Sequence, residues 1–174
     1  MTDSPLTSIR TRGDPVLSSP CQFITWPDPE LPAAVDSLRS ALLAFREAHG
    51  FGRAISAPQV GIAKRLIFCV LDNSEFVVIN PVIRWRSDAM FEVWDDCLSV
   101  PDQLVRVRRH VSISLDYQDD TGQSHGWNDL TRDESELMQH EIDHLDGILM
   151  TERAIDADSI RPMSERASLV NRSN

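Results

Sequence analysis

Residues 140–144 read His-Glu-Ile-Asp-His, an H-E-x-x-H motif. On an α-helix, residues four apart lie on the same face about one turn from each other, so His140 and His144 can reach one metal ion. Glu141 lies beside them and can carry a proton. The motif therefore indicates metal-assisted hydrolysis, although two histidines at this spacing also occur as ordinary surface or core residues.

The sequence around the motif predicts a helix from about Asp133 to Asp146. Thr131 and Glu134 form a T-x-x-E capping box before it, which satisfies free backbone N–H groups of the first turn. Gly147 is a natural stop after the last turn. Apolar residues recur at helical spacing through the segment, at Leu137, Met138, Ile142 and Leu145.

A catalytic metal site usually has three protein ligands and keeps a further position open for water, so the third ligand decides the class of enzyme. The extended protease pattern H-E-x-x-H-x-x-G-x-x-H ends here at Met150, a poor ligand for a hard or borderline divalent ion. Upstream, Cys97 offers a thiolate, a strong ligand for iron or zinc. A zinc protease of another class remains an alternative, because a downstream carboxylate could be the third ligand: Glu152, Asp156, Asp158 or Glu165.

Four segments in this order resemble the motifs of the peptide deformylases. They are Gly-Asp-Pro-Val-Leu at 13–17, Gly-Arg-Ala-Ile-Ser-Ala-Pro-Gln at 52–59, Cys-Leu-Ser-Val-Pro at 97–101 and Gln-His-Glu-Ile-Asp-His-Leu-Asp-Gly at 139–147. The second is similar to the family's G-x-G-x-A-A-x-Q motif. The resemblance runs from about Ile9 to Ile155, and motifs in order are more specific than any one alone.

This resemblance implies a hydrolase that removes the N-formyl group from the N-terminal methionine of new polypeptides and releases formate. Cys97, His140 and His144 would bind one divalent metal, usually Fe(II) in this family, with Zn(II), Ni(II) or Co(II) as substitutes. The metal would lower the pKa of a bound water, so that hydroxide is available near neutral pH to attack the formyl carbonyl.

The resemblance also assigns roles to residues around the metal. Glu141 would take the proton of the water and pass it to the leaving amine. The side-chain amide of Gln59 and the backbone N–H of Leu98 would stabilise the oxyanion. The substrate would be an N-formylated peptide.

Several positions depart from the family pattern and are the expected substrate-binding residues. Arg53 replaces a bulky apolar residue in the wall of the side-chain pocket, and Ala54 replaces a glycine. Asp95 and Asp96 replace Glu-Gly before the cysteine. These substitutions leave the metal ligands intact, so the chemistry should survive while selection of a methionine side chain is open.

Two more departures lie nearby. Ser56 replaces the first alanine of the glutamine motif, and Glu136 stands on the metal helix where the family is usually apolar. We expect Asp95 to pair with Arg109. The basic run Arg106, Arg108, Arg109 and His110 is otherwise predicted to be a solvated strand edge, or a surface that attracts an acidic group.

The remaining sequence predicts an α+β fold, with antiparallel sheets around the central metal-binding helix and an N-terminal helix from about Leu31 to Ala48. Residues 1–174 are predicted to form one catalytic domain with a polar tail from about Ser159. Short β-rich runs lie between the two helices, at 65–71, 76–80, 82–85, 90–94, 104–107 and 111–117.

Composition favours a cytoplasmic enzyme. Three cysteines do not suggest a disulfide framework, and no stretch is apolar enough to span a membrane or serve as a signal peptide. A net charge of −10 argues against reading of nucleic acid. Family members can dock on the ribosome through the C-terminal segment, so a transient ribosome contact is expected.

Three alternatives remain at this stage. One is a deformylase for a different N-formyl substrate, either a small molecule or a peptide without methionine. Another is a metalloprotease with a carboxylate ligand between Glu152 and Glu165, which would be indifferent to Cys97→Ser. The third is a non-catalytic relative, which would be expected to have lost Glu141 or a ligand; this chain keeps all of them.

Overall fold

The computed structural model describes residues 9–170. The α-helices in this range are α1 (Leu31–His49), α2 (Arg132–Leu145) and α3 (Arg166–Val170). The strands are β1 (Ala54–Ser56), β2 (Leu66–Leu71), β3 (Ser74–Arg86), β4 (Met90–Cys97), β5 (Val100–His110), β6 (Ile113–Gln118), β7 (Ser124–Trp127) and β8 (Ile160–Pro162). No helix among these residues has the length and apolarity needed to cross a membrane.

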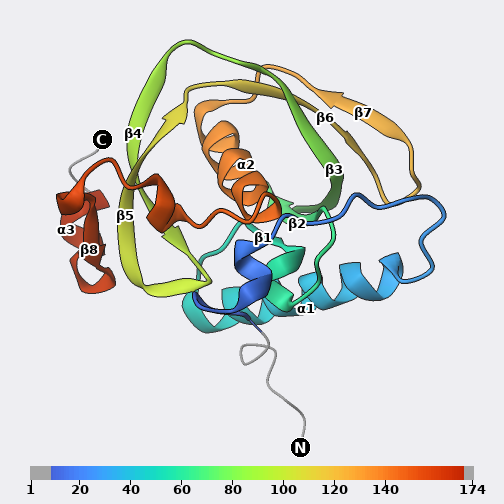
Figure 1. The fold of residues 1–174 in the computed structure, drawn as a ribbon, viewed down its shortest axis with the longest axis horizontal. Coiled ribbons are helices and arrows are strands. Elements are labelled where there is room, and N and C mark those ends of the chain that lie inside the picture. The colour runs from blue at the N-terminus through green and yellow to red at the C-terminus, as the bar shows by residue number, and fades with distance from the viewer. Residues whose placement is uncertain (1–8, 171–174) are drawn as a thin grey trace, which may run out of the picture.

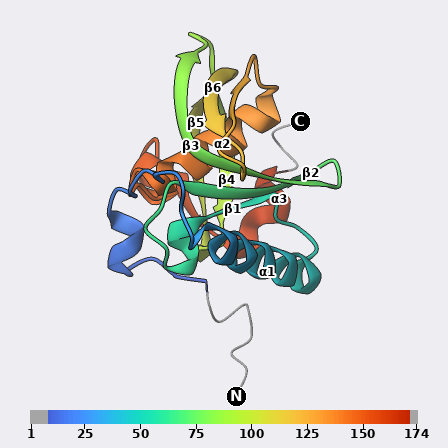
Figure 2. The same cartoon turned by 90° about the vertical axis from the view of Figure 1, so that its right-hand side faces the viewer.

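The strands form two antiparallel sheets, which confirms the predicted α+β class. One sheet has the order β1-β2-β3-β6-β7, and the other has the order β4-β5-β8. Figure 1 shows α2 at the centre, between β4 and β5 on one side and β3, β6 and β7 on the other. Figure 2 shows α1 on the side of β1 and β2 that faces away from α2. The metal helix is therefore enclosed by both sheets.

Helix α1 forms where the apolar spacing predicts it. Its buried residues recur every three or four positions: Leu31, Ala34, Leu38, Ala41, Leu42 and Phe45. Gly50 ends the helix in the left-handed conformation, with φ of 76°, and its N–H bonds to the carbonyl of Arg46 at 2.8 Å. The buried face packs on Ile55, Leu66 and Phe68, and so supports β1 and β2 on the side away from α2.

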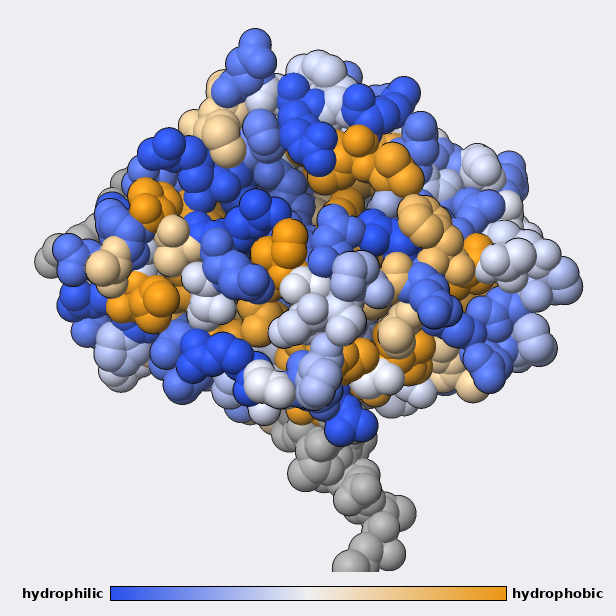
Figure 3. Space-filling view, viewed as in Figure 1, coloured by the Kyte–Doolittle hydropathy of each residue, from blue (hydrophilic) through white to orange (hydrophobic). Residues whose placement is uncertain are grey.

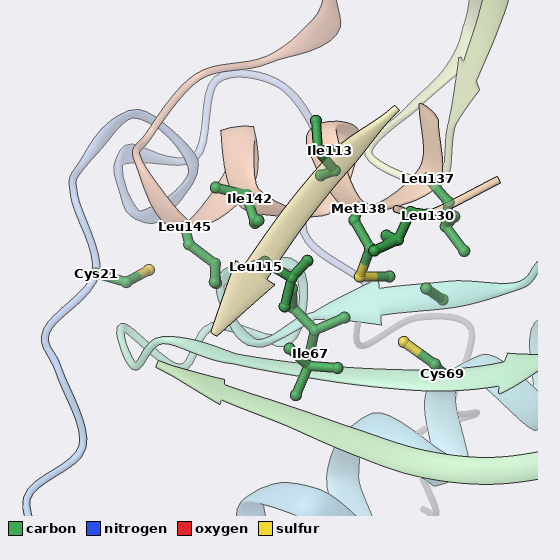
Figure 4. Close-up of a cluster of buried hydrophobic side chains, with 12 residues drawn as sticks. Cys21, Ile67, Cys69, Ile113, Leu115, Leu130, Leu137, Met138, Ile142 and Leu145 are labelled. Atoms are coloured by element: carbon green, nitrogen blue, oxygen red, sulfur yellow. The ribbon is translucent and has the colours of Figure 1, made fainter. Parts of the chain in front are cut away.

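Helix α2 is anchored by its apolar face, shown in Figure 4. The side chains of Met138, Ile142 and Leu145 pack in one buried cluster with Ile67 and Leu115 of the five-stranded sheet. Cys21 and Cys69 lie in the same cluster as free thiols. Because one face of α2 is fixed in this core, its opposite face is held in a defined position.

The strand pattern differs from the prediction at β3 and at the shortest strands. The runs predicted at 76–80 and 82–85 are one strand, β3, with a register shift between Ile79 and Val82. Asn80 has φ of 52° there, and its side chain bonds to both backbone groups of Ile24. The short strands β1, β7 and β8 were not predicted, because three or four residues carry no readable alternation. Strand β8 lies in the predicted polar tail and pairs with β5.

Candidate metal centre and active site

The N-terminal capping box fixes the start of α2. The backbone N–H of Thr131 donates to Glu134 at 2.8 Å, and the N–H of Glu134 donates back to the Thr131 hydroxyl at 3.4 Å. His140 and His144 then lie one turn apart on the buried face, with 3.2 Å between their Nε2 atoms. The helix predicted from Asp133 to Asp146 is confirmed to within one residue at each end.

Cys97 reaches the two histidines from the end of β4. A register shift between Asp95 and Cys97 breaks the regular pairing of β4 with β5, and the chain turns back at Leu98 and Ser99. The Sγ atom lies 3.2 Å from Nε2 of His144. The possible ligand atoms of Cys97, His140 and His144 all lie within 4.8 Å of one another, and all three residues are buried.

This donor set fits one divalent metal ion. Metal–nitrogen bonds of about 2.0–2.1 Å in a tetrahedral site place two nitrogens about 3.3 Å apart; the two Nε2 atoms here are 3.2 Å apart. Thiolate and imidazole suit iron, zinc, nickel and cobalt. In the described part of the chain no carboxylate joins this cluster.

None of the downstream carboxylates considered for the protease alternative joins the cluster, and three of them have partners elsewhere. Glu152 accepts from the N–H of Leu149 at 2.8 Å, and Asp156 pairs with Arg106 at 3.0 Å. Glu165 pairs with Arg161. Among the described residues, the possible third ligand that lies beside the histidines is therefore the thiol of Cys97.

Asp95 orients His140 by binding the ring nitrogen that does not face the cluster. Its Oδ2 accepts from Nδ1 of His140 at 2.8 Å and from Arg109 at 3.0 Å, as expected for the Asp95–Arg109 pair. Because Nδ1–H donates to this carboxylate, Nε2 faces the cluster with its lone pair available to a metal ion. Burial opposes the charge on Asp95, but His140 and Arg109 outweigh it and lower its pKa to about 2. The Nδ1 of buried His144, by contrast, has no hydrogen-bond partner among the described residues.

Arg109 is buried, so the prediction of a solvated strand edge was wrong for this residue. Only 3 % of it is exposed, and it also pairs with Asp143 of α2. Along β5, Val105, Val107 and Arg109 alternate toward the interior. The alternation is present in the sequence. It was missed because the adjacent Arg108, which is exposed, made the whole basic run resemble a solvated edge.

Glu141 is buried next to the metal cluster and is held by a residue whose role the sequence did not reveal. The hydroxyl of Ser56 donates to the Glu141 carboxylate and, at 3.0 Å, contacts its backbone carbonyl. Burial raises the pKa of Glu141, while His140 and the Ser56 hydroxyl offset part of that rise. The serine that departs from the family's alanine thus positions the carboxylate.

Gln59 points its amide at the cluster. Its Oε1 accepts from the N–H of Ser56 at 2.9 Å, which orients Nε2 toward Sγ of Cys97 at 3.7 Å and the hydroxyl of Ser99 at 3.2 Å. Leu98 follows Cys97 directly and, with Cys97 and Gln59, lines the cavity that opens onto the cluster. The Gln59 amide and Leu98, the two residues expected to serve the oxyanion, therefore both lie near Cys97 at the cavity.

A cavity of about 560 Å³ opens onto these groups. Arg53, Ala54, Asp95 and Asp96 all line it, together with Cys97 and His140. Other parts of its wall come from α1, from the segment that follows it, and from the C-terminal segment, through Phe45, Phe51 and Met163. Figure 3, which shows one face of the molecule, has hydrophobic residues in several separate groups among hydrophilic ones.

Arg53 and Asp96 each take part in an ion pair at this cavity. Arg53 donates to Glu136 at 2.7 Å, and Asp96 accepts from Arg166 of α3 at 3.0 Å. Asp96 does not have a positive φ, so the family's glycine is not needed for backbone conformation here. The C-terminal segment, predicted as a polar tail, thus contributes a wall to the site.

A family model described as polypeptide deformylase matches residues 6–159. A peptide deformylase of Acidobacterium capsulatum is 38 % identical over 143 residues, which cover 78 % of this chain and 79 % of the relative. A peptide deformylase of Parafrankia sp. is 37 % identical over 150 residues, covering 83 % of this chain and 76 % of the relative.

Solved structures agree with these relatives. The crystal structure of a peptide deformylase from Synechococcus elongatus, in complex with actinonin, superposes with a TM-score of 0.78 at 26 % identity, covering 99 % of this chain and 87 % of the other. That of a peptide deformylase from Thermotoga maritima gives 0.76 at 30 % identity, covering 85 % of this chain and 97 % of the other. The likeness extends over nearly the whole fold.

Proposed function

Since the chain belongs to the polypeptide deformylase family and is a hydrolase that removes the N-formyl group from new polypeptides, we propose which of its residues carry out that reaction. The substrate is an N-formylated peptide with methionine as its first residue, and the products are formate and a free amine. The observation that carries the proposal is the buried cluster of Cys97, His140 and His144, with Glu141 beside it.

In this proposal Cys97, His140 and His144 hold one divalent ion, Fe(II) by preference, with Zn(II), Ni(II) or Co(II) as substitutes. A bound divalent ion supplies a Lewis acid and lowers the pKa of a water at its open position. Asp95 acts as a positioning residue, because its contact with Nδ1 of His140 holds the ring with Nε2 toward the cluster.

Glu141 moves the protons. Its carboxylate adjoins His140 on α2 and is held by the Ser56 hydroxyl. From this position it takes the proton of the attacking water and gives it to the nitrogen of the leaving amine, so that the C–N bond breaks without expelling an amide anion.

Gln59 and Leu98 stabilise the oxygen of the formyl group. As the carbonyl carbon becomes tetrahedral, its oxygen gains negative charge and needs donors that are already in place. The Gln59 amide is oriented by its bond to the N–H of Ser56, which removes the cost of turning it during the reaction. Arg53, Ala54 and Asp96 line the cavity that receives the peptide.

The test is formate release from formyl-Met-Ala-Ser by protein loaded with Fe(II) without oxygen, or with Ni(II). We expect turnover that Glu141→Ala abolishes. Cys97→Ser should also abolish it, whereas the matched variant Cys69→Ser, at a buried thiol outside the cluster, should retain it. Full activity of C97S, or none from folded, metal-loaded wild type, would contradict the proposal.

We propose a cytoplasmic location and a transient contact with the ribosome through the C-terminal segment, because the substrate is a nascent chain. Arg161 and Arg166 of this segment are paired with Glu165 and Asp96, and Arg172 lies outside the described residues. Co-sedimentation with ribosomes at low and at physiological salt tests this contact. Complete absence of the protein from the ribosome pellet at low salt would contradict it.

A further inference from the structure

An ion pair lies in the wall of the cavity that holds the metal cluster. The Nη2 atom of Arg53 donates to Glu136 at 2.7 Å, and Nη1 reaches the carbonyl of Asp133 at 3.3 Å. Both Arg53 and Glu136 line the cavity with His140 and Glu141. The Glu136 side chain is 13 % exposed and that of Arg53 45 %, so the pair runs from the cavity wall toward its mouth.

The position of this pair relative to the reacting group follows from α2. Glu136 lies four residues before His140, about one turn away on the same face, which is roughly 6 Å along the helix axis. In an N-formyl peptide only the nitrogen and Cα separate the formyl carbon from the first side chain. When the formyl carbon is at the cluster, an unbranched side chain of methionine's length can therefore extend over one turn and place its end at the Arg53–Glu136 pair.

We propose that the Arg53–Glu136 pair contacts the end of the first side chain and extends the enzyme's specificity beyond methionine, so that an unbranched dipolar side chain of methionine's length is accepted at least as well as an apolar one. Two side chains have this chemistry, glutamine and methionine sulfoxide. The inference rests on the deformylase activity proposed for this site and adds its specificity.

The pair is complementary to a dipole. The oxygen of an amide or a sulfoxide accepts from the Arg53 guanidinium. The positive end, an amide NH₂ or the sulfoxide sulfur, faces the Glu136 carboxylate. An apolar side chain of the same length occupies the same space but offers neither group, and it removes water from a charged pair that then lacks compensating contacts.

Two neighbouring charged groups of the cavity are engaged elsewhere. Asp96 is bound to Arg166 at 3.0 Å, and Arg46 donates to the carbonyl of Gly52 at 2.6 Å. The turn of α2 that precedes His140 contributes Glu136 and Leu137 to the cavity wall. The Arg53–Glu136 pair is therefore the polar feature that a first side chain meets at this turn.

The experiment compares kcat/KM for three peptides that differ only in their first residue: formyl-glutamine, formyl-methionine sulfoxide and formyl-norleucine, each followed by Ala-Ser. Norleucine has methionine's length and no dipole. We expect wild type to hydrolyse both dipolar peptides at least as well as the norleucine peptide. R53L/E136L, with an apolar wall, should lower each dipolar-to-norleucine ratio by about tenfold or more.

Two variants serve as controls for this comparison. The swap R53E/E136R keeps a pair in the wall and should hold both ratios within about threefold. R39L removes an ion pair of similar length, Arg39–Glu75 at 2.9 Å, that lies outside the cavity, and should leave both ratios unchanged.

Unchanged ratios in R53L/E136L, with norleucine still hydrolysed, would overturn the proposal. A fall for only one dipolar peptide would support the proposal for that side chain and overturn it for the other. If the double variant does not fold, the single variant R53M is measured instead, because it removes only the more exposed partner of the pair. A sulfoxide-to-norleucine ratio in R53M equal to that of wild type would overturn the proposal. Failure of wild type on all three peptides and on formyl-methionine would instead reject the deformylase activity itself.

Discussion

Replacing Asp95 by asparagine tests how the protein holds its metal. The substitution keeps the shape of the side chain and removes its charge. In the structure, Oδ2 of Asp95 accepts from Nδ1 of His140 at 2.8 Å and from Arg109 at 3.0 Å. D95N therefore weakens the contact that orients one ligand, but it leaves every ligand in place.

The expected loss of metal affinity follows from this contact. Removing the partner of a ligating histidine typically weakens metal binding by about 10–100-fold. At a free metal concentration of 100 times the wild-type Kd, binding adds about 2.7 kcal/mol to the free energy of unfolding. A Kd weakened about 30-fold would reduce that gain to about 0.9 kcal/mol at the same concentration. The metal-free variant should itself be less stable, because Asp143 is then the one charged partner left to Arg109 among the described residues.

The assay is a titration of metal-free protein with Zn(II) against a competing chelator, together with thermal unfolding at fixed free Zn(II). Asp143→Asn is the matched control. It removes the other carboxylate of Arg109 but leaves the bond between Asp95 and His140 intact. D143N should lose stability and keep its Zn(II) affinity within about threefold.

Two results would refute this reasoning. Zn(II) affinity of D95N equal to that of wild type would show that Asp95 does not hold His140 for the metal. An equal loss in D143N would show that the effect comes from general destabilisation of the buried charges around Arg109.

Three further substitutions test the site and its support. Ser56→Ala should lower kcat about tenfold at constant KM, because Glu141 loses the hydroxyl that positions it; an unchanged kcat in the formate assay would contradict this role. Gln59→Ala should lower kcat by about 10²–10³ if its amide stabilises the oxyanion, and a change confined to KM would argue otherwise. Gly147→Ala should reduce the free energy of unfolding by about 2 kcal/mol or more, since a Cβ there, at φ of +76°, would lie 2.8 Å from backbone atoms. Gly13→Ala, at φ of +107° with nothing within 4 Å, should cost less in the same urea titration.

The sequence predicted the parts of this molecule that depend on local pattern. The apolar spacing of α1 and the capping box at Thr131 defined both long helices to within one residue. The residues predicted as metal ligands, Cys97, His140 and His144, do come together in the structure. Each lies in a short motif whose residue types have a chemical meaning.

Features that depend on contacts between distant residues could not be predicted in the same way. Ser56 meets Glu141 across 85 positions, and Arg53 meets Glu136 across 83. Nothing in the local sequence of either residue specifies its partner, because the approach of β1 to α2 is set by packing of the core between them. For the same reason, the pairing of β8 with β5 was not visible.

Alkylation of the cysteines by iodoacetamide at pH 8, with and without one equivalent of Zn(II), tests the central claim most directly. Burial raises the pKa of Cys21 to about 11 and that of Cys69 well above its usual value, so these two thiols should stay unlabelled. Cys97 lines the cavity and should take up one alkyl group in metal-free protein and none with Zn(II) bound. Labelling of Cys97 at the same rate in both samples, read by peptide mass spectrometry, would contradict a metal centre built on Cys97, His140 and His144.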